Sequence, residues 1–172
     1  MKESEKTSKI KITELDDKQI PRAKKLVDEV FKYQDFTERI SFWVYKHRHK
    51  FWIKFLSWWY GALSLEYWVA VDENGTICGT TGLYSMKKDF DEAIWLSWFC
   101  VAPTRRGQGI GKRLIEFSIE EARRRGKKYL RLYTSDDSNE AEAQFLYEKY
   151  GFVKTGEEKH DRWTLFYREK VL

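Results

Sequence analysis

A nearly continuous apolar run, IWLSWFCV at 94–101, leads into the glycine-rich stretch RRGQGIGKRL at 105–114. Such a run is typical of a strand buried on both faces at the centre of a sheet. After the glycines, apolar residues recur at helical spacing, and Gly126 suits a helix C-cap; they are Ile110, Leu114, Ile115, Ile119 and Ala122. The segment therefore predicts a central strand, a tight turn and a helix ending near Arg125.

The rest of the chain supplies further strands and helices. KIKIT at 9–13 alternates like a strand, and two β-rich runs flank Asn74-Gly75, a pair favoured in hairpin turns. Helical spacing follows Pro21 and recurs at 139–151, while 128–134 and 162–169 read as strands. With a helical segment of unclear ends at 36–66, the predicted order is β-α-α-β-β-β-α-β-α-β. This order indicates an α+β fold, a mixed α/β sandwich whose mostly antiparallel sheet is flanked by helices.

Length and composition limit the class of protein. The 172 residues suit a single domain over 1–172, with 1–7 as a disordered tail. Cys78 and Cys100 both fall in predicted strands, so we expect no disulfide and a reducing, cytoplasmic setting. The N-terminus has no apolar signal region, and no apolar stretch is long enough to span a bilayer. The net charge of +5 favours anionic ligands without indicating nucleic acid.

The glycine stretch predicts an anion site. A helix N-terminus offers unpaired N–H groups and the positive end of the helix dipole, and glycines let phosphate oxygens approach them. Arg106 and Lys112 add positive charge. The spacing fits neither a P-loop nor a dinucleotide-binding fingerprint, and a glycine-rich turn without a ligand stays open on the spacing alone.

The wider segment resembles the A motif of the GCN5-related N-acetyltransferase (GNAT) superfamily, [Q/R]-x-x-G-x-[G/A], at Arg106, Gly109 and Gly111. LYEKYGFVKTG at 146–156 resembles the later helix-to-strand segment of that superfamily. The resemblance covers roughly 8–168 and is best over 95–156. It implies a GNAT-like acyl-CoA N-acyltransferase fold, and it makes the anion the pyrophosphate of acetyl-coenzyme A (acetyl-CoA).

The resemblance also implies which residues bind this co-substrate. The strand end pairs with the pantetheine arm, the glycine stretch holds the pyrophosphate, and an asparagine touches the cofactor, although Asn139 could be only an N-cap. The implied cofactor-binding residues are Phe99, Cys100, Val101, Arg106, Gly107, Gln108, Gly109, Ile110, Gly111, Lys112 and Asn139.

The catalytic residues follow from the same resemblance. Tyr147 matches the superfamily tyrosine near the cofactor sulfur and is expected to be the general acid, with a core aromatic as the alternative. The positions where some members carry a base hold Trp95 and Ser97. Glu92 is then the candidate base, acting through water, with a loop charge as the alternative. A water chain alone, or an amine that arrives neutral, is equally consistent.

Other reactive side chains give weaker signals. Cys100 lies in an apolar strand without a basic neighbour in sequence, so a small hydrophobe is the expected role. His47 and His49 do not share a helical face and have no acidic or cysteine partners nearby, so no metal is expected. His160 falls in a charged loop and is expected to be solvated.

The segment FWVYKHRHKFWIKFLSWWY at 42–60 mixes aromatic and basic residues. It could form the wall of an acceptor pocket, a lid or dimer surface, a peripheral membrane contact, or ordinary core; we favour core and pocket wall. The basic run at 123–128 is expected to be a solvated helix end. We therefore expect no nucleic acid, no stable membrane insertion and a possible homodimer.

Together these features predict an acetyl-CoA-dependent N-acetyltransferase that acetylates a primary amine of a small molecule or peptide, without a metal. A non-catalytic acyl-CoA binding or sensing module is the alternative. The sequence names neither the acceptor nor the base.

Overall fold

The structure is a computed structural model that describes residues 9–32, 34–161 and 163–172, so the predicted tail at 1–7 lies outside it. The described residues form one seven-stranded sheet in the order β1-β2-β3-β4-β5-β7-β6. Among the described strands only β4 and β5 run parallel, and the other neighbours are antiparallel. The strands are β1 (Lys11–Glu14), β2 (Ala62–Val71), β3 (Ile77–Met86), β4 (Ala93–Val101), β5 (Tyr129–Ser135), β6 (Val153–Lys159) and β7 (Thr164–Val171).

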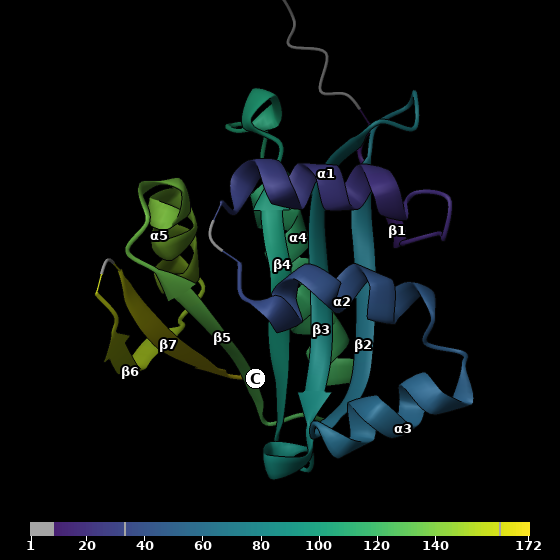
Figure 1. The fold of residues 1–172 in the computed structure, drawn as a ribbon. Helices are drawn as coiled ribbons and strands as arrows, with labels where there is room; N and C mark the ends of the chain where they lie inside the picture. Colours follow the sequence, from purple (N-terminus) through teal and green to yellow (C-terminus); the bar gives the residue numbers. More distant parts are fainter. Residues whose placement is uncertain (1–8, 33, 162) are drawn as a thin grey trace, which may run out of the picture.

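Helices cover both faces of the sheet. Figure 1 shows α1 and α2 in front of the strands and α4 behind them. Every residue predicted to face inward on α4 is buried, and so is the predicted central strand β4 along most of its length. The predicted α+β class is confirmed. The helices are α1 (Ile20–Val30), α2 (Phe36–Lys46), α3 (Phe51–Trp59), α4 (Ile110–Arg124) and α5 (Ala141–Lys149).

The structure corrects the predicted order of elements at two points. Three helices, not two, precede β2, because the chain turns at 47–50 and separates α2 from α3. Two strands, not one, follow α5. The missed strand, β6, lies at the edge of the sheet and is exposed along nearly its whole length. A strand with no buried face carries no alternating pattern by which the sequence could reveal it.

The divergence of β4 from β5 creates the space for a site. The two strands pair only where Ala93–Trp95 lie beside Tyr129–Arg131, after which β5 continues with β7 as its partner. Further along β4, the pairing with β3 shifts register, and Trp98 takes a φ of +41°. Thr80 stabilises this bulge by donating a 2.5 Å hydrogen bond to the carbonyl of Trp98. The strands therefore separate toward the end where α5 lies (Figure 1).

Within the described ranges, no helix has both the length and the apolar character needed to cross a bilayer.

Candidate functional site

Beyond their short pairing, β4 and β5 diverge and leave a wedge between them. A pocket of about 300 Å³ lies in this wedge. The end of α1, the end of β4, the glycine loop, the start of α4 and the α5 region all contribute to it. Its lining consists of Val30, Phe31, Phe99, Cys100, Val101, Arg105, Arg106, Gly107, Gly109, Ile110, Gly111, Lys112, Asn139, Glu140, Glu142, Ala143, Leu146 and Tyr147.

The glycine loop presents its backbone to this pocket. Gly107 and Gly109 have φ values of +75° and +74°, which favour glycine, and a Cβ on either would meet nothing within 4 Å. Gly109 is also the N-cap of α4 and offers no side-chain cap to the first-turn amides. Gly111 instead packs closely, because a Cβ there would lie 3.5 Å from Leu146. The loop therefore leaves open space beside unpaired N–H groups at the positive end of a helix, which suits an anion.

Arg105 anchors this loop to the hairpin between β2 and β3. Its guanidinium donates a 2.7 Å hydrogen bond to the buried carboxylate of Asp72. The other oxygen of Asp72 accepts from the backbone N–H groups of Asn74 and Thr76, and these bonds hold the pKa of Asp72 below its ordinary value. Arg105 therefore holds the loop in place through its contact with Asp72.

Arg106 and Lys112 supply positive charge at the pocket. The side chain of Arg106 is about one-third exposed and lies 3.9 Å from Glu142. Lys112 is more exposed and lies 3.9 Å from Glu116. Because both ion pairs are long and partly solvated, either cation is free to turn toward a bound anion.

Tyr147 of α5 is buried against the pocket. Its ring lies 5.6 Å from that of Phe99 on β4 and 5.6 Å from that of Phe152. Burial raises the pKa of the Tyr147 phenol well above its ordinary value, and the nearby Glu140 and Cys100 reinforce this. The phenol therefore stays protonated at neutral pH, as a proton donor must.

Asn139 also lines the pocket, on the short turn before α5. The capping residue of that turn is Asp137, whose side chain accepts from the Asn139 N–H at 2.8 Å. The sequence allowed Asn139 to be an N-cap, but Asp137 caps this turn and Glu140 is the N-cap residue of α5.

Of the residues predicted for the site, all but Gln108 and Glu92 line the pocket. Gln108 is exposed at the outside of the loop. Glu92 lies before the start of β4, where Arg131 donates to it at 2.9 Å and also binds Asp89 and Glu169. Seven residues separate Glu92 from Phe99, roughly 20 Å along a strand. The structure does not bring Glu92 to the pocket.

A carboxylate that the sequence analysis missed lies between α2 and β5. Glu38, in the first turn of α2, accepts a 2.9 Å hydrogen bond from the hydroxyl of Tyr133 on β5 and another from the backbone N–H of Asp35. Burial raises the pKa of Glu38. No cation pairs with it among the described residues. The D-F-T-E capping box at 35–38 was visible in the sequence, but its contact with β5 was not.

Trp98 connects this carboxylate to the pocket. Its indole N–H donates a 2.8 Å hydrogen bond to the hydroxyl of Ser41, about one turn after Glu38 on α2. Its ring packs 5.2 Å from that of Phe31, which lines the pocket. Glu140, another lining residue, contributes to the raised pKa of Glu38. Glu38 is not among the residues that line the pocket, but these contacts place it near the pocket, between α2 and β5.

Neither cysteine has the setting of a nucleophile. Cys78 and Cys100 are free and buried. Burial raises the pKa of Cys100 to about 11, and its sulfur lies 3.4 Å from the hydroxyl of Thr80. A thiol with so high a pKa is a weak source of thiolate.

Two other predicted features lie apart from the pocket. No aromatic residue of 42–60 lines it, so the structure gives the proposed pocket wall no support. The basic run at 123–128 is largely engaged, because Arg123, Arg124 and Arg125 pair with Glu120, Glu121 and Glu66.

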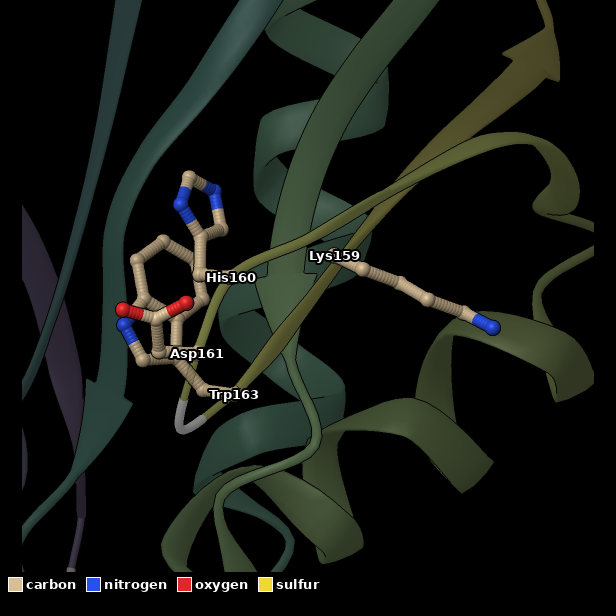
Figure 2. Close-up of a pocket in the computed structure, with 4 residues that line it drawn as sticks. All are labelled: Lys159, His160, Asp161 and Trp163. Carbon is tan, nitrogen blue, oxygen red and sulfur yellow. The ribbon is translucent and has the colours of Figure 1, made fainter.

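A second hollow, of about 430 Å³, lies at the hairpin between β6 and β7. Figure 2 shows His160 stacked over Trp163 with Asp161 beside them, while Lys159 points the other way. The two rings lie 3.9 Å apart, and Glu158 is 3.5 Å from the imidazole. His160 is thus a partly exposed loop residue, and this open hollow brings no reactive group to the wedge.

Comparisons with known proteins agree with this architecture. The family model for the acetyltransferase (GNAT) domain matches residues 64–154, more than half of the chain. No curated protein matches the sequence. Among solved structures, a GNAT-family acetyltransferase from Staphylococcus aureus Mu50 is 18% identical with a TM-score of 0.70, covering 94% of this chain and 99% of its own.

Two further structures share the fold. An N-acetyltransferase from Staphylococcus aureus Mu50 is 22% identical with a TM-score of 0.68, covering 95% of this chain and 99% of its own. The Salmonella typhimurium protein yncA, solved with its cofactor acetyl-CoA, is 20% identical with a TM-score of 0.64, covering 95% and 94%. The predicted family and fold are confirmed.

Proposed function

The chain belongs to the GNAT acetyltransferase family, and on that premise we propose that it is an acetyl-CoA-dependent N-acetyltransferase acting on a primary amine. The observation that carries this proposal is the wedge between β4 and β5. The pocket in it offers an open glycine cradle and a buried, protonated tyrosine. Between α2 and β5 lies a carboxylate without a cation partner among the described residues.

The residues present fit acetyl-CoA. The space beside Gly107 and Gly109 is open, where a side chain would occupy it. The loop and first-turn amides would hold the pyrophosphate, with Arg106 and Lys112 adding charge. The edge of β4 from Phe99 to Val101, beyond the point where its pairing with β5 ends, would hold the pantetheine arm. When bound, acetyl-CoA supplies an acetyl thioester as the acyl donor.

Tyr147 would act at the departing sulfur. As the amine nitrogen bonds to the acetyl carbon, the carbon–sulfur bond breaks and the sulfur takes the electron pair. The phenol of Tyr147 donates its proton to that sulfur, and a placed acid of this kind contributes roughly 10²–10⁴-fold to the rate. The raised pKa of the phenol keeps it protonated at neutral pH, so that it has a proton to donate.

Glu38 would act on the amine. An amine at neutral pH arrives as an ammonium, and a half-buried carboxylate without a cation partner attracts it. The raised pKa of Glu38 also makes it a better proton acceptor than an ordinary glutamate. Tyr133 fixes the carboxylate by its hydrogen bond to one oxygen. Glu38 thereby takes the role for which the sequence offered Glu92.

The experiment that tests the function is a thiol-release assay with acetyl-CoA and a panel of amines. The panel holds polyamines, amino acids, aminoglycosides, and peptides with free N-termini or lysines. Release of coenzyme A together with an acetylated amine supports the proposal. Tight acetyl-CoA binding without release on any amine would favour the acyl-CoA sensing module instead.

A further inference from the structure

α3 exposes an unusual apolar surface. Seven of its nine residues are apolar, yet only Ile53 is buried. Phe51 is 84% exposed, Trp59 72% and the following Tyr60 75%. Folded monomers rarely leave so many large apolar side chains together in water unless the surface binds something. The surface, called here the α3 face, consists of Trp43, Phe51, Trp52, Phe55, Leu56, Trp58, Trp59, Tyr60 and Leu63.

The α3 face is held together by its own aromatic contacts. The rings of Trp43 and Trp52 lie 5.8 Å apart, which joins the end of α2 to the start of α3. Those of Phe55 and Trp58 lie 6.3 Å apart. Lys87, at the end of β3, lies 3.2 Å above the ring of Trp58. Aromatic contacts therefore connect α2 to α3 within the α3 face, and Lys50 and Lys87 lie against its rings.

The chain segment that carries most of the α3 face has charges of one sign. Residues 39–65 contain five lysines and arginines and no aspartate or glutamate. The net charge of the whole chain is also +5, so the rest of the chain carries equal numbers of positive and negative residues. Lys46, Lys50 and Lys54 are exposed and form no ion pair among the described residues. The partner of this surface must therefore be anionic as well as apolar.

We propose that the α3 face docks on a membrane surface that carries anionic lipid headgroups. Tryptophan and tyrosine favour the boundary between headgroups and acyl chains, and a short helix with an aromatic face and lysines beside it lies in that boundary. The lysines stay at the headgroups while the rings enter the boundary. The proposal is independent of the proposed acetyl transfer.

The charge also argues against a second copy of the chain. A two-fold dimer through the α3 face would bring two cationic surfaces together and bury them against each other. A nucleic acid would supply negative charge, but it usually lies in a groove with stacking platforms. The α3 face is the outside of a helix and includes aliphatic Leu56 and Leu63, which suits lipid.

Docking in this way would leave the pocket accessible. Gly79 of β3 pairs with Val101 at the pocket end of the sheet, and β3 ends at Met86 beside α3. The ten residues of β3 span roughly 30 Å. In Figure 1 α3 lies at the opposite end of the strands from α1.

The test is flotation of the full chain with vesicles of phosphatidylcholine, with and without phosphatidylglycerol, at low and high salt. We expect binding to the anionic vesicles that salt weakens, with a blue shift of tryptophan emission. Lys46→Glu/Lys50→Glu/Lys54→Glu should weaken binding at least tenfold. Lys18→Glu/Lys25→Glu/Lys149→Glu makes the same change of charge on exposed lysines elsewhere and should bind nearly as the unmodified chain does.

Apolar contact is tested separately. Phe51→Ser should weaken vesicle binding severalfold, whereas Phe145→Ser, at a residue 74% exposed on α5, should not. Circular dichroism of each variant checks that it folds.

Three results would overturn the proposal: no binding to anionic vesicles, equal loss in both lysine variants, or equal loss in both phenylalanine variants. Two further results would show that the α3 face binds a different partner. One is a dimer in sedimentation that Phe51→Ser abolishes, and the other is nucleic-acid binding without vesicle binding.

Discussion

The hydroxyl of Tyr133 on β5 donates a 2.9 Å hydrogen bond to the carboxylate of Glu38 on α2, across 95 positions of sequence. The bond joins α2, which covers one face of the sheet, to β5, which has diverged from β4. It holds in place a carboxylate whose pKa burial raises. The first two predictions concern this carboxylate.

Glu38→Gln keeps an oxygen to accept from Tyr133 but removes the negative charge. We expect kcat/KM for the amine to fall roughly 10²-fold or more, because both the attraction for ammonium and the proton acceptor are lost. The Kd of acetyl-CoA should stay the same. Steady-state kinetics and calorimetry check both. Glu73→Gln, in the exposed hairpin turn before β3, is the control, and an equal loss of activity in it would contradict the role of Glu38.

The pH profile follows from the same bond. If ionised Glu38 is required, activity rises with pH through the pKa of Glu38, which lies above that of an ordinary glutamate. The hydrogen bond from Tyr133 lowers this pKa, so Tyr133→Phe should move the acidic limb to higher pH. An unchanged limb, measured as kcat/KM against pH, would show that another group titrates.

Tyr147→Phe keeps the buried ring and removes the proton that we assign to the departing sulfur. We expect kcat to fall roughly 10²-fold while the Kd of acetyl-CoA changes little. The loss should shrink with an acyl donor whose thiol is more acidic, because such a thiolate leaves without protonation. Equal loss with both donors would point to packing instead.

Gly109→Ala tests the open cradle against a matched glycine. Gly109 and Gly75 share a φ of +74°, and an added Cβ at either meets nothing within 4 Å. Both substitutions should therefore cost about 1–2 kcal/mol of stability. Only Gly109→Ala should weaken acetyl-CoA binding, by tenfold or more, because only that Cβ enters the pocket. Calorimetry on both variants decides the point, and equal weakening would contradict an anion site at the loop.

Glu121 is expected to stabilise the fold in a pH-dependent way. Hydrogen bonds from Arg124 and then Arg125 lower its pKa to about 2. Its contribution is therefore complete above the ordinary glutamate pKa and is lost as the pH falls toward about 2. At neutral pH, Glu121→Gln should cost about 1–2 kcal/mol of unfolding free energy after allowance for solvent screening.

The neighbouring Glu120 is the control for that measurement. It pairs with Arg123 at 2.6 Å, but its side chain is 69% exposed against 13% for Glu121. Glu120→Gln should therefore change the unfolding free energy by about 0.5 kcal/mol or less. Urea unfolding of both variants over the acidic range tests the difference.

The sequence alone determined the elements whose signal is local. β4 and α4 were predictable because two buried faces and a helical stripe require apolar residues at fixed spacings. The glycine loop was predictable because left-handed backbone at Gly107 and Gly109 excludes most other residues. Tyr147 followed from a resemblance carried by its neighbours in the chain.

The tertiary structure decided what depends on distant partners. Glu92 lies apart from the pocket because Arg131 holds it at the far end of β4. Glu38 became a candidate because its hydrogen bond with Tyr133 on β5, the strand that diverges from β4, exists only in the folded chain. β6 and the exposed α3 face show the same limit, because a sequence records which side chains are apolar, whereas packing between remote segments decides which of them water reaches.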